Sequence, residues 1–299
     1  MPAEFSSLIE LFDAIPDEDA AVNYFKAIRW ARGEFCAYCG HKKVYGFSNG
    51  RTWKCAACRA RFSIRVGTIF EDSKIPLRKW LAAIWLITSH RKGIASTQLA
   101  RDIDVTQKTA WFMLHRLRHA ARTRSFNRPL RGEVEIDETF VGGKDKNKHA
   151  HKRGKDDKVI VFGMLERGGE LRAKTLESLR DAKREVIANV DPAAHVMTDE
   201  WPGYKAIEKR FNRYSVNHSS GEYVKHYFAH VNGIEGVWSL LKRQIIGIHH
   251  WVSAKHLGRY VDEVVWRYNR RASEEAKRVN EFLARTDGRL TYQELIAKA

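Results

Sequence analysis

Three carboxylates at widely separated positions, Asp137, Asp199 and Glu235, could together hold divalent cations. Two such cations about 4 Å apart polarise a scissile phosphate, activate the attacking oxygen and steady the leaving one. Mg²⁺ or Mn²⁺ suits carboxylate oxygens and water better than thiolates or imidazoles. Lys242 follows Glu235 by two helical turns and would offer a point charge to a phosphate backbone. These residue types indicate phosphoryl transfer with two metal ions.

Each of these acids also has an ordinary interpretation. Taken singly, an acid at a strand end or on a helix is more often solvated or capping than a ligand. Glu133, Glu135 and Glu138 compete with Asp137 on its own strand, and Glu200 competes with Asp199. Alternation along a strand excludes Glu138 as a same-face partner of Asp137 but leaves Glu135 as an alternative.

The sequence between residues 133 and 245 predicts the elements that position these acids. Residues 133–141 alternate in polarity and predict a strand that bears Asp137. The other predicted elements are a hairpin of strands 158–166 and 170–176, a helix over 179–190, a strand over 194–198 that ends at Asp199, a helix from 200, a strand over 214–216 and a helix over 230–245. This order, three strands, helix, strand, helix, strand, helix, predicts an α/β sandwich with the order of a ribonuclease H fold.

The helix predicted over 230–245 would bring the third acid. Glu235 and Lys242 share one helical face, with Asn232 one turn before the glutamate. A neighbouring stripe of apolar residues at helical spacing would anchor this helix to a core: Ile234, Val237, Trp238 and Leu241. Glu235 is therefore predicted as the ligand that completes the site.

All four cysteines form two Cys-x-x-Cys pairs, Cys36 with Cys39 and Cys55 with Cys58, with fifteen residues between the pairs. Two such turns supply four thiolates to a tetrahedral zinc, and strand-like residues between them predict a zinc ribbon. Two disulfides or reactive thiols are the alternative, and structural disulfides are rare in a reducing compartment. Because no ligand position is left open, the predicted zinc is structural. Basic residues around it are available to phosphates: Lys42, Lys43, Arg51, Lys54, Arg59 and Arg61.

Residues 77–122 have helical periodicity. A helix over 77–90 is followed by a short helix that Ser96 is expected to cap and a longer one, 107–122, that Thr106 is expected to cap. A short helix, a tight turn and a longer basic helix predict a helix-turn-helix whose last helix enters a major groove. The alternative is an ordinary three-helix bundle with a solvated basic face.

The composition points to a polyanionic partner. The 299 residues include 53 Lys and Arg against 36 Asp and Glu, a formal net charge of +17. Nucleic acid is the commonest partner for such an excess. The longest apolar run, 80–87, is far shorter than the roughly 20 residues that span a bilayer. The first residues do not start a signal peptide, so a cytoplasmic location is expected.

A Gly-, Lys- and His-rich insert, 144–155, is expected to be a mobile loop. It either solubilises the protein or contacts phosphates, and composition does not separate the two. Residues 125–132, with Pro129 and Gly132, are expected to be a linker.

Several motifs in order resemble one family. They are WKC-x-x-C with RFS and GTIF over 53–70, EIDETFVGG over 135–143, TDEW over 198–201, VNHS over 216–219 and N-x-IEG-x-WS-x-x-KR over 232–243. This set resembles the IS1595 insertion-sequence family, with its ISXO2-like DDE transposase domain. The resemblance runs from about residue 20 to about residue 271, where the sequence ends in RYNRR.

The resemblance implies a bacterial DNA transposase with a ribonuclease H-like catalytic domain preceded by a zinc ribbon and a helix-turn-helix domain. Its first acid falls on Asp137, its second on Asp199 and its third on Glu235, with Lys242 as the following basic residue. Some members have an Asn in the last helix and others a Glu, and both Asn232 and Glu235 are present here. Glu235 is favoured as the ligand because it carries charge, with Asn232 as a second ligand or an orienting residue.

The expected function is to bind the terminal inverted repeats of an insertion sequence, cleave the ends and join them to target DNA, as a homodimer or larger assembly at the bacterial nucleoid. The expected cofactors are two Mg²⁺ or Mn²⁺ ions and a structural Zn²⁺. The alternatives are a non-catalytic, domesticated DNA-binding regulator and a simple nuclease of the same fold. The expected segments are a helical lead-in 1–30, the zinc ribbon 31–70, the helix-turn-helix domain 71–128, the catalytic domain 129–250 and a helical C-terminal tail 251–299.

Overall fold

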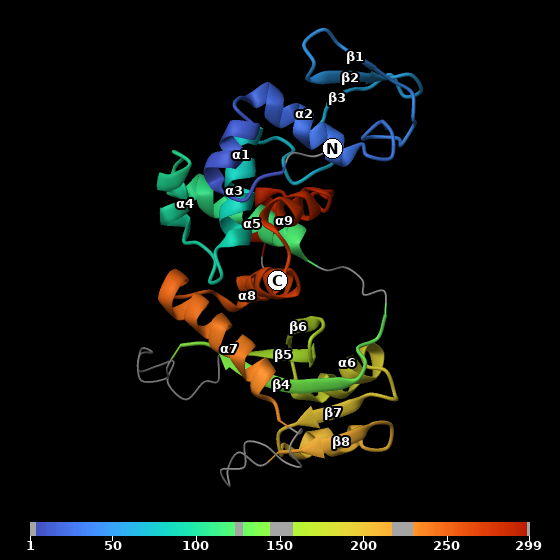
Figure 1. Ribbon diagram of the computed structural model, residues 1–299, viewed down its shortest axis with the longest axis vertical. Coiled ribbons are helices and arrows are strands. Elements are labelled where there is room, and N and C mark those ends of the chain that lie inside the picture. The colour runs from blue at the N-terminus through green and yellow to red at the C-terminus, as the bar shows by residue number, and fades with distance from the viewer. Residues whose placement is uncertain (1–3, 123–127, 144–157, 217–229, 298–299) are drawn as a thin grey trace. The chain divides into compact units, whose positions relative to one another are not determined.

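The structure is a computed structural model that describes residues 4–122, 128–143, 158–216 and 230–297. The chain divides into two units (Figure 1): unit 1 is Met1–Ala121 with Ala272–Ala299, and unit 2 is Arg122–Arg271. The predicted tail, 251–299, is thus shared between the two units. The insert 144–155 and most of the VNHS motif lie outside the described residues. No helix among the described residues is long and apolar enough to cross a membrane.

Unit 1 contains a small antiparallel sheet, of order β1-β2-β3, that carries the cysteine region. Its strands are β1 (Val44–Gly46), β2 (Thr52–Cys55) and β3 (Arg61–Ser63). The core beneath this sheet is aromatic, because Trp53 of β2 packs edge-on against Trp30 with ring centroids 5.1 Å apart. A sheet this small buries few apolar side chains, so it has little stability of its own.

The helices of unit 1 come from both ends of the chain. They are α1 (Leu8–Ala14), α2 (Glu18–Arg29), α3 (Leu77–Ser89), α4 (Ser96–Asp102), α5 (Gln107–Ala121), α9 (Glu275–Leu283) and α10 (Tyr292–Ile296). Helix α9 packs on α2 and α3. Ile69 N donates to Thr286 O at 2.8 Å, and Gly288 N donates to Gly67 O at 2.9 Å. The C-terminal segment is therefore part of the fold of unit 1.

The three helices predicted between 77 and 122 are present as α3, α4 and α5. The Thr106 hydroxyl caps α5 by accepting from Thr109 N at 3.2 Å, as predicted. The predicted Ser96 cap is wrong, because Ala95 precedes α4 and Ser96 is its first helical residue. Arg116 of α5 is buried and donates to the carbonyl oxygens of Ile69 and Glu71, so this arginine is internal to unit 1 and not on a solvated basic face.

Unit 2 is built on a five-stranded sheet of order β6-β5-β4-β7-β8. Its strands are β4 (Glu133–Val141), β5 (Val159–Glu166), β6 (Leu171–Leu176), β7 (His195–Thr198) and β8 (Asn212–Ser215). Strand β5 is antiparallel to β4 and β6, whereas β7 is parallel to β4 and to β8. The five strands predicted for this region are present, in the predicted order along the chain.

The helices of unit 2 connect these strands and cover both faces of the sheet. They are α6 (Ala182–Asn189), α7 (Asn232–Gln244) and α8 (Ala254–Asn269), with 3₁₀ helices η3 (Leu179–Asp181) and η4 (Pro202–Ile207) and a π-helical turn η6 (Ile245–His249). The helix predicted from residue 200 is thus a 3₁₀ helix, with Pro202 in its first turn as expected.

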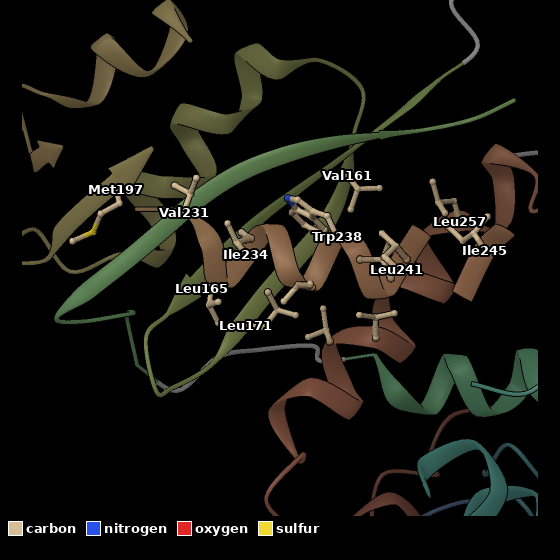
Figure 2. Packing of buried hydrophobic residues seen from close by; sticks show 14 of the residues in the cluster. Val161, Leu165, Leu171, Met197, Val231, Ile234, Trp238, Leu241, Ile245 and Leu257 are labelled. Atoms are coloured by element: carbon tan, nitrogen blue, oxygen red, sulfur yellow. The ribbon is translucent and has the colours of Figure 1, made fainter. Parts of the chain in front are cut away.

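Alternation along the strands sorts their side chains into two core layers. On one face, Val161 and Leu165 of β5 pack with α7 and α8. On the other, Phe162 and Met164 pack with α6 and η4. Figure 2 shows Ile234, Trp238 and Leu241 of α7 in the first layer, so the stripe predicted to anchor this helix is confirmed. The two layers hold β4 at the centre of the sheet with one face toward α7.

Candidate active site

Asp137 and Asp199 lie side by side because β4 and β7 are parallel neighbours. Glu135 pairs with Met197 in this ladder, and two more residues along each strand lead to Asp137 and Asp199. Burial, and then the charges of Glu138 and Asp199, raise the pKa of Asp137 to about 7. A cation between the two aspartates would relieve this repulsion, so these donors fit a hard divalent ion.

Helix α7 contacts Asp137 through an indole. Trp238 Nε1 donates to Asp137 Oδ2 at 2.9 Å. Gly163 of β5 lies opposite Asp137 in the ladder, and a Cβ built on Gly163 would lie 2.5 Å from Cη2 of Trp238. The glycine therefore lets the ring lie against the sheet and reach the carboxylate. The sequence predicted Trp238 as a core residue, and its hydrogen bond to the aspartate was not foreseen.

Glu135, the rival of Asp137, holds the N-terminus of α7. It is 1% exposed and accepts from Ile234 N at 2.9 Å and from Arg167 Nε at 2.7 Å. Arg167 Nη2 also donates to His230 O, just before the helix, at 2.8 Å. A carboxylate at a helix N-terminus interacts favourably with the helix dipole. Glu135 therefore has a structural role that occupies its carboxylate.

Glu138 lies on the opposite face of β4, as alternation predicts, and accepts from the Tyr204 hydroxyl of η4. Burial, and then the charge of Asp199, raise the pKa of Glu138. Its own charge also raises the pKa of Asp137. Glu138 thus acts on the site electrostatically although it points away from α7. Alternation along the strand excluded Glu138 as a same-face partner of Asp137. It does not account for the electrostatic effect of a charge on the opposite face of the strand.

The main chain of Asp199 is fixed from β8 and from the turn that follows. Its carbonyl oxygen accepts from Arg213 Nη2 at 2.9 Å and from the Ser215 hydroxyl at 3.1 Å. Its Oδ1 accepts from Trp201 N at 3.1 Å. These bonds hold the end of β7 beside Asp137, so the second acid is positioned by its neighbouring strand.

The residues predicted on α7 are exposed. Asn232 is the first residue of the helix, Glu235 lies one turn later, and Lys242 lies two turns after Glu235. Among the described residues, the cysteines alone form a group of three or more His, Cys, Asp or Glu side chains whose ligand atoms lie within 4.8 Å of one another. The structure thus places Asp137 and Asp199 at neighbouring strands, but the ligand atoms of Asp137, Asp199 and Glu235 do not all lie within that distance of one another.

The four cysteines converge in unit 1. The Sγ atoms of Cys36 and Cys58 are 3.7 Å apart, and those of Cys39 and Cys55 are 3.6 Å apart. Four sulfurs about 2.3 Å from a central zinc would have separations of about this size. Backbone amides of the turns donate to two sulfurs, Tyr38 N to Cys36 and Ala57 N to Cys55. The cluster fits a structural tetrahedral Zn²⁺, as predicted.

Comparisons with known proteins match parts of both units. The model of an ISXO2-like transposase domain matches residues 129–269, and the model of a transposase zinc-ribbon domain matches residues 16–61. An uncharacterized protein in transposable element ISH50 of Halobacterium salinarum is 31% identical over 266 residues, which cover 82% of this chain and 88% of that protein. No solved structure matches the chain.

Proposed function

This chain belongs to the IS1595 family of insertion-sequence transposases, and from that premise we propose that it cleaves DNA strands at the ends of an insertion sequence and joins them to target DNA. The observation that carries the proposal is the pair Asp137, on β4 and bonded to Trp238 of α7, and Asp199, directly after the parallel neighbour β7, whose charge raises the pKa of Asp137. The sheet order β6-β5-β4-β7-β8 supports a ribonuclease H-like catalytic domain. Cleavage and joining are both phosphoryl transfers, so one site serves both steps.

The residues of unit 2 would hold the reacting groups as follows. Two Mg²⁺ or Mn²⁺ ions, when bound, would polarise the scissile phosphate and the attacking oxygen. Asp137 and Asp199 would hold them from the sheet, with one oxygen of Asp137 kept in place by Trp238. Glu235, an exposed residue of α7, would turn toward the aspartates and complete the set of ligands. Lys242 would bind the phosphate backbone two turns further along the same helical face.

DNA binding falls to unit 1 in this proposal. The zinc ribbon exposes cations at its rim, among them Lys42, Lys43 and Arg61. Helices α4 and α5, joined through a turn in which Asp104 has φ 51°, serve as a helix-turn-helix with the N-terminal turns of α5 toward the DNA. The protein would act in the cytoplasm at the nucleoid, as a dimer or larger assembly that holds two element ends.

The test is a strand-transfer assay on DNA that carries the element ends, with Mg²⁺ or Mn²⁺. Glu235→Gln should bind DNA as the unchanged protein does and lose joining by about a thousandfold or more, because a neutral amide is a poor ligand for a hard cation. Glu177→Gln, an exposed glutamate of the same unit, is the matched control and should join normally.

The same assay discriminates the other possibilities. Full joining by Glu235→Gln with loss in Asn232→Ala would move the third ligand to Asn232. Binding by the unchanged protein without metal-dependent nicking would indicate a regulator. Nicking without joining would indicate a simple nuclease.

A further inference from the structure

The exposed face of α7 leads away from the acidic site to two exposed apolar side chains. Glu235 and Lys242 lie seven residues apart on one face of α7, and Ile246 follows in the π-helical turn η6 at the end of the helix. Ile246 is 67% exposed, and Trp251 beyond it is 69% exposed. An exposed apolar patch rimmed by polar side chains commonly marks a contact with another molecule.

The turn that presents Trp251 has a fixed base. The π-helical turn η6 ends at His249, and the next residue, His250, has φ 60°. Beneath it, Gln244 donates to Glu263 Oε1 at 3.2 Å and accepts from Arg267 Nη2 at 2.7 Å, and all three side chains are buried. This network ties the end of α7 to α8. The indole of Trp251 is therefore exposed on a turn whose base is held by buried hydrogen bonds.

The charge of this region favours one class of partner. Between Glu235 and Asp262 the chain contains no acidic residue, and its charged side chains are Lys242, Arg243, Lys255 and Arg259. Lys242, Arg243 and Lys255 are exposed. A flat aromatic group among cations fits a polyanion that also offers stacking surfaces, which describes a nucleic acid strand with unpaired bases.

We propose that Trp251 stacks on an unpaired nucleotide of the DNA whose phosphate lies at the Asp137–Asp199 site, with Ile246 as a second apolar contact. This inference rests on the proposed function. From Glu235 to its last residue Gln244, α7 spans roughly 13 Å, or about four stacked base steps, and Ile246 and Trp251 lie beyond that end. The unpaired nucleotide would therefore lie a few steps from the reacting phosphate, where opening of the duplex exposes a strand end to the site.

The experiment compares two labelled DNA probes on the full-length protein. One is a fully paired duplex, and the other is the same duplex with a short stretch of unpaired bases. Trp251→Ala should weaken binding of the unpaired probe by about five- to a hundredfold and leave the paired probe unchanged, since stacking acts on the unpaired base. Trp251→Phe should retain most of the affinity. Ile9→Ala, which removes an exposed apolar side chain of unit 1, should change neither probe.

Three results would overturn the inference. The first is equal binding of the unpaired probe by Trp251→Ala and the unchanged protein. The second is an equal loss on both probes, which would indicate a general effect on DNA binding or folding. The third is a change of oligomeric state in Trp251→Ala without DNA, which would assign the patch to a second copy of the chain. In each of these three results, the unchanged protein still binds and joins DNA. If the proposed function itself were wrong, the unchanged protein would neither bind nor join DNA.

Discussion

The two candidate metal sites of this chain are built in opposite ways. The cysteine cluster draws its four ligands from two short turns around a three-stranded sheet with little core. The proposed acidic site would draw its ligands from β4, from the end of β7 and from α7 of unit 2, where the sheet has a core layer on each face. We expect zinc to hold the fold around the first site together, and the fold around the second site to form without metal.

The two sites also differ in how their candidate ligand atoms are arranged. The sulfurs lie at the separations of a tetrahedral zinc site. At the acidic site, Asp137 and Asp199 repel and Glu235 remains at the surface. We expect structural metals to be needed for folding and catalytic metals to be needed only for activity. Three experiments probe this contrast, beginning with the largest expected effect.

Removal of zinc should unfold the ribbon. Structural zinc contributes roughly 10 kcal/mol or more to small domains of this kind, so Cys39→Ser or a strong chelator should abolish hydrogen-exchange protection in β1–β3. Protection in β4 and β5 should remain, because those strands have their own core. Zinc content and amide exchange measure both effects. Ribbon amides that stay protected in the metal-free protein would contradict a zinc-dependent fold.

A methyl group at Gly163 should displace α7 from the sheet. The new Cβ would meet the Trp238 ring at 2.5 Å, and overpacking of this kind costs about 2–3 kcal/mol. Gly163→Ala should therefore lower the free energy of unfolding of unit 2 and weaken the bond from Trp238 to Asp137. Denaturant unfolding is the measurement.

Gly236→Ala on α7 is the matched control, because nothing lies within 4 Å of its added Cβ. Alanine in a helix interior should raise stability by about 0.5–1 kcal/mol. If Gly163→Ala and Gly236→Ala changed the free energy of unfolding alike, the close approach of Trp238 to Gly163 would not be what positions α7 on the sheet.

Neutralising Asp137 should change how stability depends on pH. Its pKa is raised from 3.8 to about 7, so the folded protein binds this proton more tightly than the unfolded chain. The associated stability is fully present below about pH 4 and is lost as the pH rises to about 7. Asp137→Asn should therefore stabilise the metal-free protein at pH 8 by about 1–2 kcal/mol and much less at pH 4.

The response of the melting temperature to Mg²⁺ tests whether this pH effect arises at the proposed metal site. At pH 8, Mg²⁺ should raise the melting temperature of the unchanged protein but not that of Asp137→Asn, because the cation replaces the lost proton. Asp262→Asn is the control: burial raises the pKa of Asp262 to about 6, yet Asp262 is not one of the proposed ligands, so its variant should keep the Mg²⁺ response. A Mg²⁺ response that survives Asp137→Asn would argue against a cation at Asp137.

The sequence was informative where the signal is local. Two Cys-x-x-Cys turns define their own geometry, and alternation along 133–141 correctly placed Asp137 on the opposite face of the strand from Val134 and Ile136. The Thr106 cap and the anchoring stripe of α7 were predicted for the same reason. The Ser96 cap failed because a one-residue shift of a helix start changes the capping residue.

Features that depend on tertiary contacts could not be predicted. The salt bridge of Glu135 with Arg167 and the bond of Glu138 with Tyr204 join residues far apart in the sequence. The salt bridge engages Glu135, which alternation left as an alternative to Asp137. The hydrogen bond engages Glu138, which alternation excluded. The indole bond to Asp137 likewise depends on Gly163, whose relation to Trp238 appears only once β5 lies under α7.

The return of the chain to unit 1 at Ala272 bears on the order in which the protein matures during synthesis. Unit 2 is one continuous stretch and can fold as it leaves the ribosome. Unit 1 must wait for α9, which packs on α2 and α3, and for Thr286, which pairs with Ile69. The half proposed to hold DNA is therefore completed last, so a nascent chain acquires its acidic site before it can be anchored on an element end.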